Sequence, residues 1–305
     1  MSPIHDGTVL VTGGAGFIGS HLVDALVEDN QVRVLDDFST GERTRLPEEV
    51  SVFEGDIRDA AFLEDATEDA DIVYHEAAMV DVEESVRRPR ECTTANVEGT
   101  VNVLEAARHE DARVVFASSA AVYGRPDRVP IEEDHPIAPT NPYGVSKQAG
   151  EQYCRLYHEL YDLDTVMLRY FNVYGPRQSG GQYSGVIDVF LDQALAGESI
   201  TVHGDGSQTR DFVYVDDVVR ANLLAGTTEH VGETFNVGTG SSVSVLELAA
   251  LIREAVDSDS SITHVEARAG DIDRSLADVS LAHSTLGFES TVPLRDGLES
   301  LVAER

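Results

Sequence analysis

Lysine is almost absent from this chain: Lys147 is the only one among 305 residues, and 22 basic residues face 55 acidic ones. Long hydrophobic runs are absent too, and without a stretch of about eighteen apolar residues a transmembrane helix is excluded. A strand pattern begins at residue 8 and leaves no room for a signal peptide, so we expect a cytoplasmic protein. The two cysteines, Cys92 and Cys154, are too few for a disulfide framework and are expected to be free and buried.

The acidic charge is the strongest feature of the composition. A formal net charge of −33 is spread along the chain, with no acidic tail. Self-repulsion at this density destabilises a compact fold, but at ~1 M salt the Debye length falls to roughly 3 Å and the repulsion is screened. Scarce lysine with abundant Asp and Glu resembles the proteins of salt-in halophiles, so we interpret the charge as an adaptation to salt. It also argues against nucleic acid and anionic membrane as partners.

Short runs rich in valine and isoleucine alternate with helical patterns as far as residue 170. We expect strands over 8–12, 31–36, 50–54, 71–75, 113–118 and 164–169, with helices that include 17–28, 91–109 and 142–161. This alternation predicts an α/β fold with a doubly wound parallel sheet of the Rossmann type.

Beyond residue 170 the alternation loosens. Helices are expected near 184–196, 216–225, 244–256 and 294–303. We therefore predict a nucleotide-binding domain over 1–170 and a smaller C-terminal α/β domain over 171–305, and leave open a return of the chain to the first domain.

A glycine-rich turn follows the first strand, with Gly13, Gly16 and Gly19 three residues apart. Such glycines let the backbone turn tightly and approach a pyrophosphate, and the helix that follows offers its first N–H groups to the phosphates. Asp36 ends the second strand, where a carboxylate can accept a hydrogen bond from a ribose 2′-hydroxyl. Because Asp36 and Asp37 would together repel a 2′-phosphate, the pattern predicts NAD as the cofactor and disfavours NADP.

Further motifs run through nearly the whole chain. They occupy residues 13–19, 55–59, 75–78, 96–100, 118–124, 141–147, 169–178, 204–212 and 268–271. In combination they resemble those of the extended short-chain dehydrogenase/reductases, and within these the NAD-dependent nucleotide-sugar epimerase/dehydratase family. The resemblance implies a Rossmann domain that binds NAD, a second domain that binds a nucleotide sugar, and no metal.

The motifs on either side of residue 130 carry the residues for proton transfer. Lys147 lies four residues after Tyr143, which on a helix puts both side chains on one face. A phenol titrates near pH ~10, so its use as a base near neutrality requires its pKa to fall by about three units. The Lys147 ammonium and the positive nicotinamide ring of NAD⁺ are the natural causes. Ser119 can share a proton with Tyr143, so the predicted catalytic residues are Ser119, Tyr143 and Lys147.

The resemblance also implies the ligand contacts. Those to NAD are Gly13, Gly16, Phe17, Ile18, Asp36, Asp37, Ser39, Gly41, Asp56, Ile57, Ala77, Ala78, Asn96, Ser118, Tyr143, Lys147 and Tyr170. Those to the nucleotide sugar are Ser119, Asn172, Val202, His203, Arg210, Arg268, Asp271 and Ser275. Arg210 and Arg268 suit a diphosphate, because a guanidinium offers forked donors. For Val202 and His203, a nucleobase site and an ordinary strand both stay open, as do a salt bridge and a ligand contact for Arg177.

The branch of the family is indicated by Ala120 and Ala121. Dehydratases of this family carry Asp-Glu there and related decarboxylases a Glu, whereas alanine can neither donate nor accept a proton. The site therefore resembles that of UDP-glucose 4-epimerases, in which Tyr143 would take the proton of the sugar O4 while hydride passes from C4 to NAD⁺ and back to the other face.

Two further positions bear on the substrate. Seven residues after Arg268 the family places a gate, and the small Ser275 at that position implies room for an N-acetylhexosamine as well as for glucose and galactose. The resemblance also implies that a uronate epimerase would carry an arginine that residues 179–181 lack. A third position bears on the cofactor: Val80 stands where some epimerases have a lysine that touches the nicotinamide ribose.

Alternatives stay open. They are a UDP-glucuronate 4-epimerase and an NAD-dependent sugar dehydrogenase or reductase that releases its cofactor at every turnover. A non-enzymatic NAD-binding regulator is disfavoured, because such proteins usually lose the tyrosine or lysine that this chain keeps. The family generally pairs two long helices per subunit, so the helices over 91–109 and 142–161 predict a homodimer.

The halophile interpretation predicts that both activity and fold are lost below molar salt, because unscreened carboxylates repel one another. Circular dichroism and turnover, followed across a series of KCl concentrations, measure the two properties. Full function in dilute buffer would contradict the interpretation.

Overall fold

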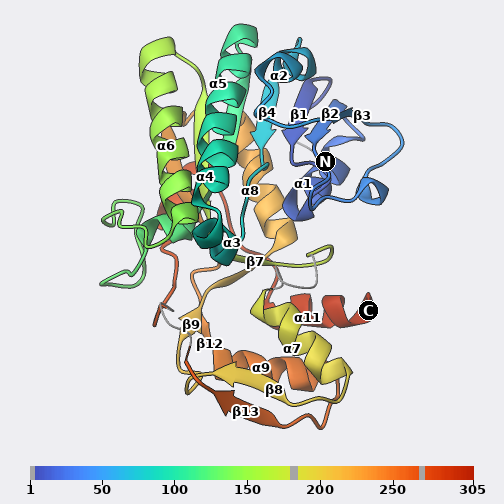
Figure 1. The fold of residues 1–305 in the computed structure, drawn as a ribbon, viewed down its shortest axis with the longest axis vertical. Helices are drawn as coiled ribbons and strands as arrows, with labels where there is room; N and C mark the ends of the chain where they lie inside the picture. The colour runs from blue at the N-terminus through green and yellow to red at the C-terminus, as the bar shows by residue number, and fades with distance from the viewer. Residues whose placement is uncertain (1–3, 179–184, 268–271) are drawn as a thin grey trace.

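Seven parallel strands form the sheet at the centre of the larger part of the molecule (Figure 1). The computed structural model describes residues 4–178, 185–267 and 272–305. In sheet order the strands are β11 (Glu233–Val237), β6 (Thr165–Tyr170), β5 (Arg113–Ser119), β4 (Ile72–His75), β1 (Thr8–Thr12), β2 (Gln31–Asp36) and β3 (Ser51–Glu54). The six strands expected before residue 170 are present within one residue at each end, and the predicted Rossmann-type fold is confirmed.

Helices cover both faces of this sheet because side chains alternate along each strand. Val9 and Val11 join the core beneath α1 (Phe17–Leu26) and α8 (Val215–Thr227), with α10 (Ser280–Leu286) beside β11. Leu10 points the other way, into the core beneath α2 (Ala60–Thr67), α5 (Gly99–Glu110) and α6 (Pro142–Tyr161). Cys92 and Cys154 are free and buried, as expected.

The helix expected over 91–109 is present, but it is not one regular α-helix. The segment consists of α4 (Pro89–Thr93), a wider π turn (Thr94–Glu98) and α5. Asn96, within the π turn, donates from Nδ2 to the Met79 carbonyl (2.9 Å) and to Ser146 Oγ (2.9 Å), and its Oδ1 accepts from the Met79 N–H (2.7 Å). These contacts come from outside the segment, so its own pattern did not reveal the wider turn.

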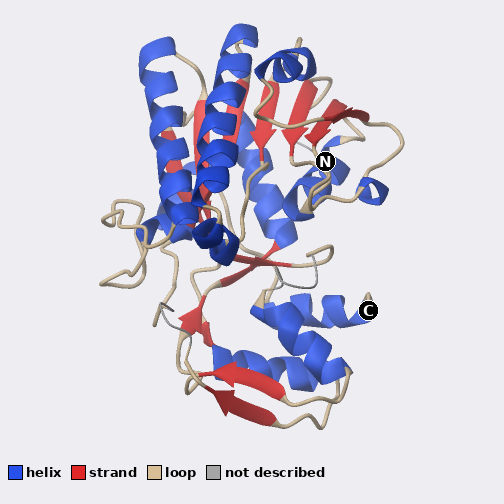
Figure 2. Ribbon diagram, in the orientation of Figure 1, coloured by secondary structure: helices blue, strands red, loops and turns tan. Residues whose placement is uncertain are grey.

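The smaller part of the molecule is built from three helices and short strand pairs (Figure 2). Its helices α7 (Val186–Leu195), α9 (Val245–Ala255) and α11 (Leu294–Ala303) share one apolar core. Its strands pair as β7 (Asn172–Tyr174) with β10 (Phe212–Tyr214), β8 (Ile200–His203) with β13 (Ile262–Val265), and β9 (Thr209–Arg210) with β12 (Val243–Ser244). Three short elements belong to the larger part in the described residues. They are α3 (Val82–Arg87) and the 3₁₀ turns Arg43–Arg45 and Ala120–Tyr123.

The chain passes between the two parts more than once. After β7 to β10 have formed in the smaller part, α8 and β11 return to the large sheet, where β11 pairs with β6. The division at residue 170 therefore stays a prediction about domains, while the sheet itself draws on both sides of that position.

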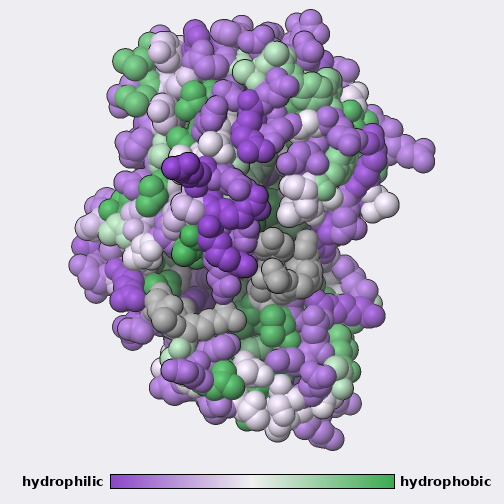
Figure 3. Space-filling model, in the orientation of Figure 1, coloured by the Kyte–Doolittle hydropathy of each residue, from purple (hydrophilic) through white to green (hydrophobic). Residues whose placement is uncertain are grey.

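The surface is largely polar on the face that Figure 3 shows. Within the described parts of the chain, no helix combines the length and the apolar character needed to cross a membrane.

A buried ion pair joins α6 to the end of β6. The side chains of Glu151 and Arg169 are 1% and 2% exposed, and Glu151 accepts two hydrogen bonds from Arg169 (2.8 and 2.7 Å) and one from Ser118 Oγ (2.6 Å). Arg169 also donates to the Tyr123 hydroxyl (2.8 Å), which in turn donates to Asn236 Oδ1 of β11 (2.7 Å). Every charge in this network has a partner, which is the condition for a buried ion pair to hold a structure together.

Replacing Glu151 with alanine leaves the Arg169 guanidinium buried without a counter-charge. We expect Glu151→Ala to lower the free energy of unfolding by about 3–5 kcal/mol, measured by urea denaturation. The matched control is Glu254→Ala, which removes an exposed pair with Arg295 and should leave the urea midpoint unchanged. Equal midpoints for the two variants would refute a structural role for the buried pair.

Candidate active site

The glycine-rich turn lies at the carboxyl ends of β1 and β4, where the strand order reverses. An added Cβ on Gly13, whose φ is +70°, would lie 2.7 Å from the Ala77 nitrogen, and one on Gly19 would lie 2.2 Å from the Gly13 oxygen. Gly16 caps α1 without a side-chain hydrogen bond, so the first N–H groups of the helix, starting at Phe17, stay available to a ligand. The turn thus fits the pyrophosphate of a dinucleotide.

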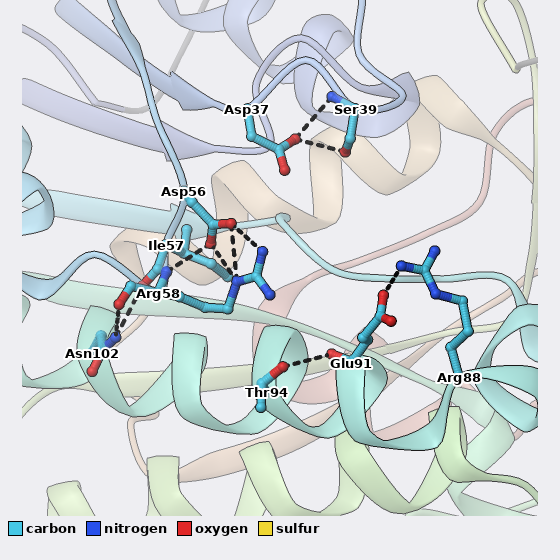
Figure 4. Close-up of polar contacts among 9 residues, drawn as sticks. All are labelled: Asp37, Ser39, Asp56, Ile57, Arg58, Arg88, Glu91, Thr94 and Asn102. Carbon is cyan, nitrogen blue, oxygen red and sulfur yellow. Dashed lines mark hydrogen bonds and ion pairs between the residues drawn. The ribbon is translucent and has the colours of Figure 1, made fainter.

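Two adjacent carboxylates lie at the carboxyl end of β2, Asp36 as its last residue and Asp37 directly after it. Asp36 is 7% exposed and accepts from the N–H groups of Ala15 (2.9 Å) and Phe38 (2.8 Å); burial raises its pKa, and these two hydrogen bonds oppose the rise. Asp37 accepts from the backbone and hydroxyl of Ser39 (Figure 4). An added Cβ on Gly41 would lie 2.9 Å from Asp36 Oδ1. The two carboxylates therefore stand beside the glycine-rich turn, as a site for the ribose of NAD requires.

The segment after β3 is held by polar contacts with α5, as Figure 4 shows. Asn102 Nδ2 donates to the Ile57 carbonyl (3.1 Å), and Arg58 Nε donates to Asp56 (2.9 Å). The neighbouring Arg58 guanidinium keeps the pKa of Asp56 below its usual range. Ile57 is buried against Gly99, where an added Cβ would come within 2.5 Å of its side chain. These contacts hold Asp56 and Ile57 at the carboxyl edge of the sheet, where Asp37 also lies.

The three predicted catalytic residues come together at the carboxyl end of β5. Helix α6 begins there, with Asn141 Oδ1 accepting from the Gly144 N–H (2.8 Å), and this cap fixes the first turn that carries Tyr143. The Ser119 side chain lies close enough to Tyr143 to lower the pKa of the phenol. One turn on, Lys147 Nζ donates to the Ala117 carbonyl (2.7 Å) and lies 6.0 Å from the Tyr143 ring centre. An ammonium, a phenol and a hydroxyl therefore gather at this end of β5.

Burial dominates the protonation of this site. It raises the pKa of Tyr143 to about 12, and the nearby Ser119 side chain opposes the rise. Burial lowers the pKa of Lys147 to about 8, and the negative charge of Glu76 opposes that fall. The surrounding side chains therefore raise the pKa of Tyr143, whereas use of the phenol as a base is expected to need a lowered one.

Some predicted NAD contacts have side chains already engaged within the protein. The Ser118 hydroxyl donates to Glu151, and the Tyr170 hydroxyl donates to Glu76 (2.7 Å). Asn96 is 2% exposed and holds the backbone of Met79, next to Ala78. These side chains therefore make contacts within the protein, and contacts of these residues with NAD stay predictions.

Two residues at the end of β4 received no role from the sequence. His75 is buried between Thr12 Oγ1 (2.8 Å from Nδ1) and Thr100 Oγ1 (3.0 Å from Nε2). Burial lowers the pKa of His75 to about 3, so the ring is neutral. Burial raises the pKa of Glu76 to about 7. The sequence did show two adjacent titratable residues within the motif at 75–78. It did not reveal a role for them, because the residues that contact them lie far away in the sequence.

The predicted sugar-nucleotide residues lie on the smaller part and its junction with the sheet. Asn172 Nδ2 donates to the Asp211 carbonyl (2.8 Å), while the backbone N–H of the buried Ser275 donates to the Thr209 carbonyl (3.0 Å). Val202 has no exposed surface, and its side chain belongs to the core of the smaller part. His203 Nδ1 lies 3.0 Å from the Glu266 carbonyl.

Some of the predictions fall on residues that the structure does not describe. Arg268 and Asp271 lie outside the described residues, as do residues 179–181. Arg177 forms a salt bridge with Asp24 of α1 (2.7 Å), which accounts for its charge without a ligand.

Two cavities open on the surface. One of about 310 Å³ is lined by Arg210 together with Phe212, Thr239 and Val243, and so lies beside a predicted diphosphate contact. The larger, of about 570 Å³, is lined by Asp71, Arg113 and Asp164 among others, at the amino ends of β4, β5 and β6. It lies at the wrong edge of a parallel sheet for catalysis, because ligands of such folds bind at the carboxyl ends.

Comparison with known proteins agrees with this arrangement. Residues 9–238 match the model of the NAD dependent epimerase/dehydratase family. The chain belongs to this family, and NAD is its cofactor. Over 298 residues it is 43% identical to a putative UDP-glucose 4-epimerase of Methanocaldococcus jannaschii, covering 96% of this chain and 97% of the relative.

Two solved structures are similar over almost their whole length. One is the UDP-N-acetylglucosamine 4-epimerase of Methanobrevibacter ruminantium, in complex with UDP-N-acetylmuramic acid (TM-score 0.94, 36% identity, 99% of this chain and 100% of that chain). The other is the UDP-glucose 4-epimerase of Thermotoga maritima with UDP-glucose (TM-score 0.94, 38% identity, 97% of each chain). Proteins named as a dehydratase and a decarboxylase match too, so membership of the family leaves the reaction open.

Proposed function

We propose that this enzyme interconverts the C4 epimers of a UDP-sugar. The observation that carries the proposal is the pair Ala120 and Ala121, in the 3₁₀ turn that follows Ser119. An added Cβ on Gly144 would lie 2.6 Å from the Ala121 oxygen, so this turn packs directly against the start of α6 and Tyr143. Two methyl groups beside the catalytic tyrosine cannot assist the elimination of water or the loss of a carboxyl group.

The residues then divide the work as follows. Tyr143, as phenolate, takes the proton of the sugar O4, and Ser119 hydrogen-bonds the same oxygen. Lys147 keeps a positive charge near both oxygens. Bound NAD⁺ supplies the hydride acceptor. After the 4-keto sugar has turned its other face, Tyr143 would return the proton to O4 as the hydride goes back from the reduced cofactor to C4.

The sugar is held at its nucleotide end, which permits that turn. Arg210 lies half-buried beside the smaller cavity, where its guanidinium suits a diphosphate. Ser275 is small and 4% exposed, so we expect both hexoses and N-acetylhexosamines to be accepted. A relative named as a UDP-N-acetylglucosamine 4-epimerase supports the second group of substrates.

We also propose that two copies associate through α6. Its outer face exposes Tyr153 (38%), Leu156 (45%), Leu160 (66%) and Tyr161 (51%), which recur at helical spacing. Such a stripe is unfavourable in water and is typical of a helix that packs against a partner. A second copy is the expected partner because a symmetric dimer pairs the stripe with itself.

The reaction is tested with UDP-galactose, UDP-N-acetylgalactosamine and UDP-galacturonate, each incubated with the purified protein in molar KCl. We expect chromatography to resolve the C4 epimers of the first two without added NAD. Tyr143→Phe should abolish turnover and retain NAD, because only the proton acceptor is lost. Tyr153→Phe, a matched change on the exposed face of α6, should stay active. Activity in Tyr143→Phe, or no epimer from any sugar with folded, NAD-loaded protein, would sink the proposal.

The dimer is tested by placing a charge within the exposed stripe. Leu160→Glu should convert the dimer to a monomer in analytical ultracentrifugation, since the carboxylate would be buried in the interface. Leu195→Glu, at a leucine 47% exposed on α7, is the control and should leave the mass unchanged. A wild-type protein that sediments as a monomer would rule out this association.

A further inference from the structure

The carboxyl group of Glu76 is fixed at the end of β4 by a chain of hydrogen bonds. The Tyr170 hydroxyl donates to Glu76 Oε1 (2.7 Å) and accepts from Asn222 Nδ2 (2.8 Å). Asn222 is part of α8, and the same amide also donates to the Val218 carbonyl one turn earlier in that helix (2.9 Å). Elements far apart in the sequence thus converge on one glutamate, which no step described above uses.

Glu76 and Lys147 approach the same point of the sheet edge from opposite faces. His75 is paired in register with Phe116, so Glu76 lies one position further on, beside Ala117. The Ala117 carbonyl is the acceptor of the Lys147 ammonium. His75 points towards Thr100 of α5; by alternation Glu76 points towards α8, whereas Lys147 enters from α6.

The charges around this pair are few. The Tyr170 phenol of β6 contacts Glu76 directly and also contacts the neutral amide of Asn222 on α8, whereas the Lys147 ammonium of α6 acts on Glu76 through its charge. Facing Lys147 are Glu76 and two thiols, Cys92 of α4 and Cys154 of α6. Glu76 is therefore the carboxylate that opposes the desolvation of Lys147 in the described structure. Its charge also acts on Tyr143, whose pKa it raises.

We propose that Glu76 is a positioning residue for proton transfer: its carboxylate, held by Tyr170, stabilises the ammonium form of the buried Lys147. Through both charges it sets the pH range in which Tyr143 and Lys147 work together. The second statement rests on the proposed function, whereas the first is a property of the protein itself. Two neighbouring groups of opposite charge favour each other's ionised form, and more so where water is excluded.

The single lysine allows a direct test. Protein labelled with [ε-¹³C]lysine has one labelled residue, so its NMR titration reports the pKa of Lys147 alone. We expect Glu76→Gln to lower that pKa by about one unit, because an opposite charge is removed from a desolvated site. The matched control is Glu133→Gln, at a partly buried glutamate that accepts from the Asn236 N–H and lies outside this cluster. Coincident titrations of wild type and Glu76→Gln would overturn the proposal.

A second variant covers a failure of Glu76→Gln to fold. Tyr170→Phe keeps the carboxyl group and removes its donor, so Glu76 holds its proton to higher pH and the pKa of Lys147 should again fall, by a smaller amount. An unchanged Lys147 titration in this variant would overturn the role of Tyr170 and Glu76.

The pH profile of epimerisation separates positioning from a structural role. Loss of the Glu76 charge lowers the pKa of both Tyr143 and Lys147, so both limbs of the profile should move to lower pH in Glu76→Gln. A uniformly reduced rate with unmoved limbs would count against the proposal. If no sugar is epimerised but the Lys147 titration moves, the proposed function fails and the charge pairing stands.

Discussion

The buried ion pair between Glu151 and Arg169 is the interaction on which the rest of the site depends. Glu151 lies one helical turn after Lys147 on α6, and Arg169 directly precedes Tyr170 on β6. The same carboxylate accepts from Ser118, next to Ser119. One desolvated pair therefore fixes the helix that carries the base, the strand that supports Glu76, and the end of β5. A buried pair is a costly way to gain stability, but it admits few alternative arrangements.

Burial also dominates the charge state of the residues proposed for proton transfer. It favours a neutral phenol at Tyr143 and weakens the ammonium of Lys147. A positively charged ligand at the same edge would oppose the first effect, because a positive charge favours the phenolate. In the proposed reaction, the charge of the cofactor and the base would therefore act together.

A feature of this structure was predictable from the sequence where its cause lies within one segment, and it was not where the cause lies in residues far away along the chain. The strands of the sheet follow local runs of valine and isoleucine, and the turn at Gly13 follows from backbone sterics, so both were predictable. The π turn at Asn96 and the role of Glu76 were not, because their partners come from other elements. Tyr170 lies 94 residues from Glu76 along the chain. For Val202 the sequence left two alternatives open, because a core strand and a ligand-lining strand share one pattern.

The return of the chain to the sheet has a consequence for biosynthesis. Strand β11 supplies the edge that covers β6, and it is made some sixty residues later than that strand. Until it emerges from the ribosome, β6 presents unpaired backbone groups at an open edge, a template for aggregation. The order of synthesis therefore delays completion of the large sheet until much of the smaller part of the molecule exists. In this enzyme the two parts are therefore completed together.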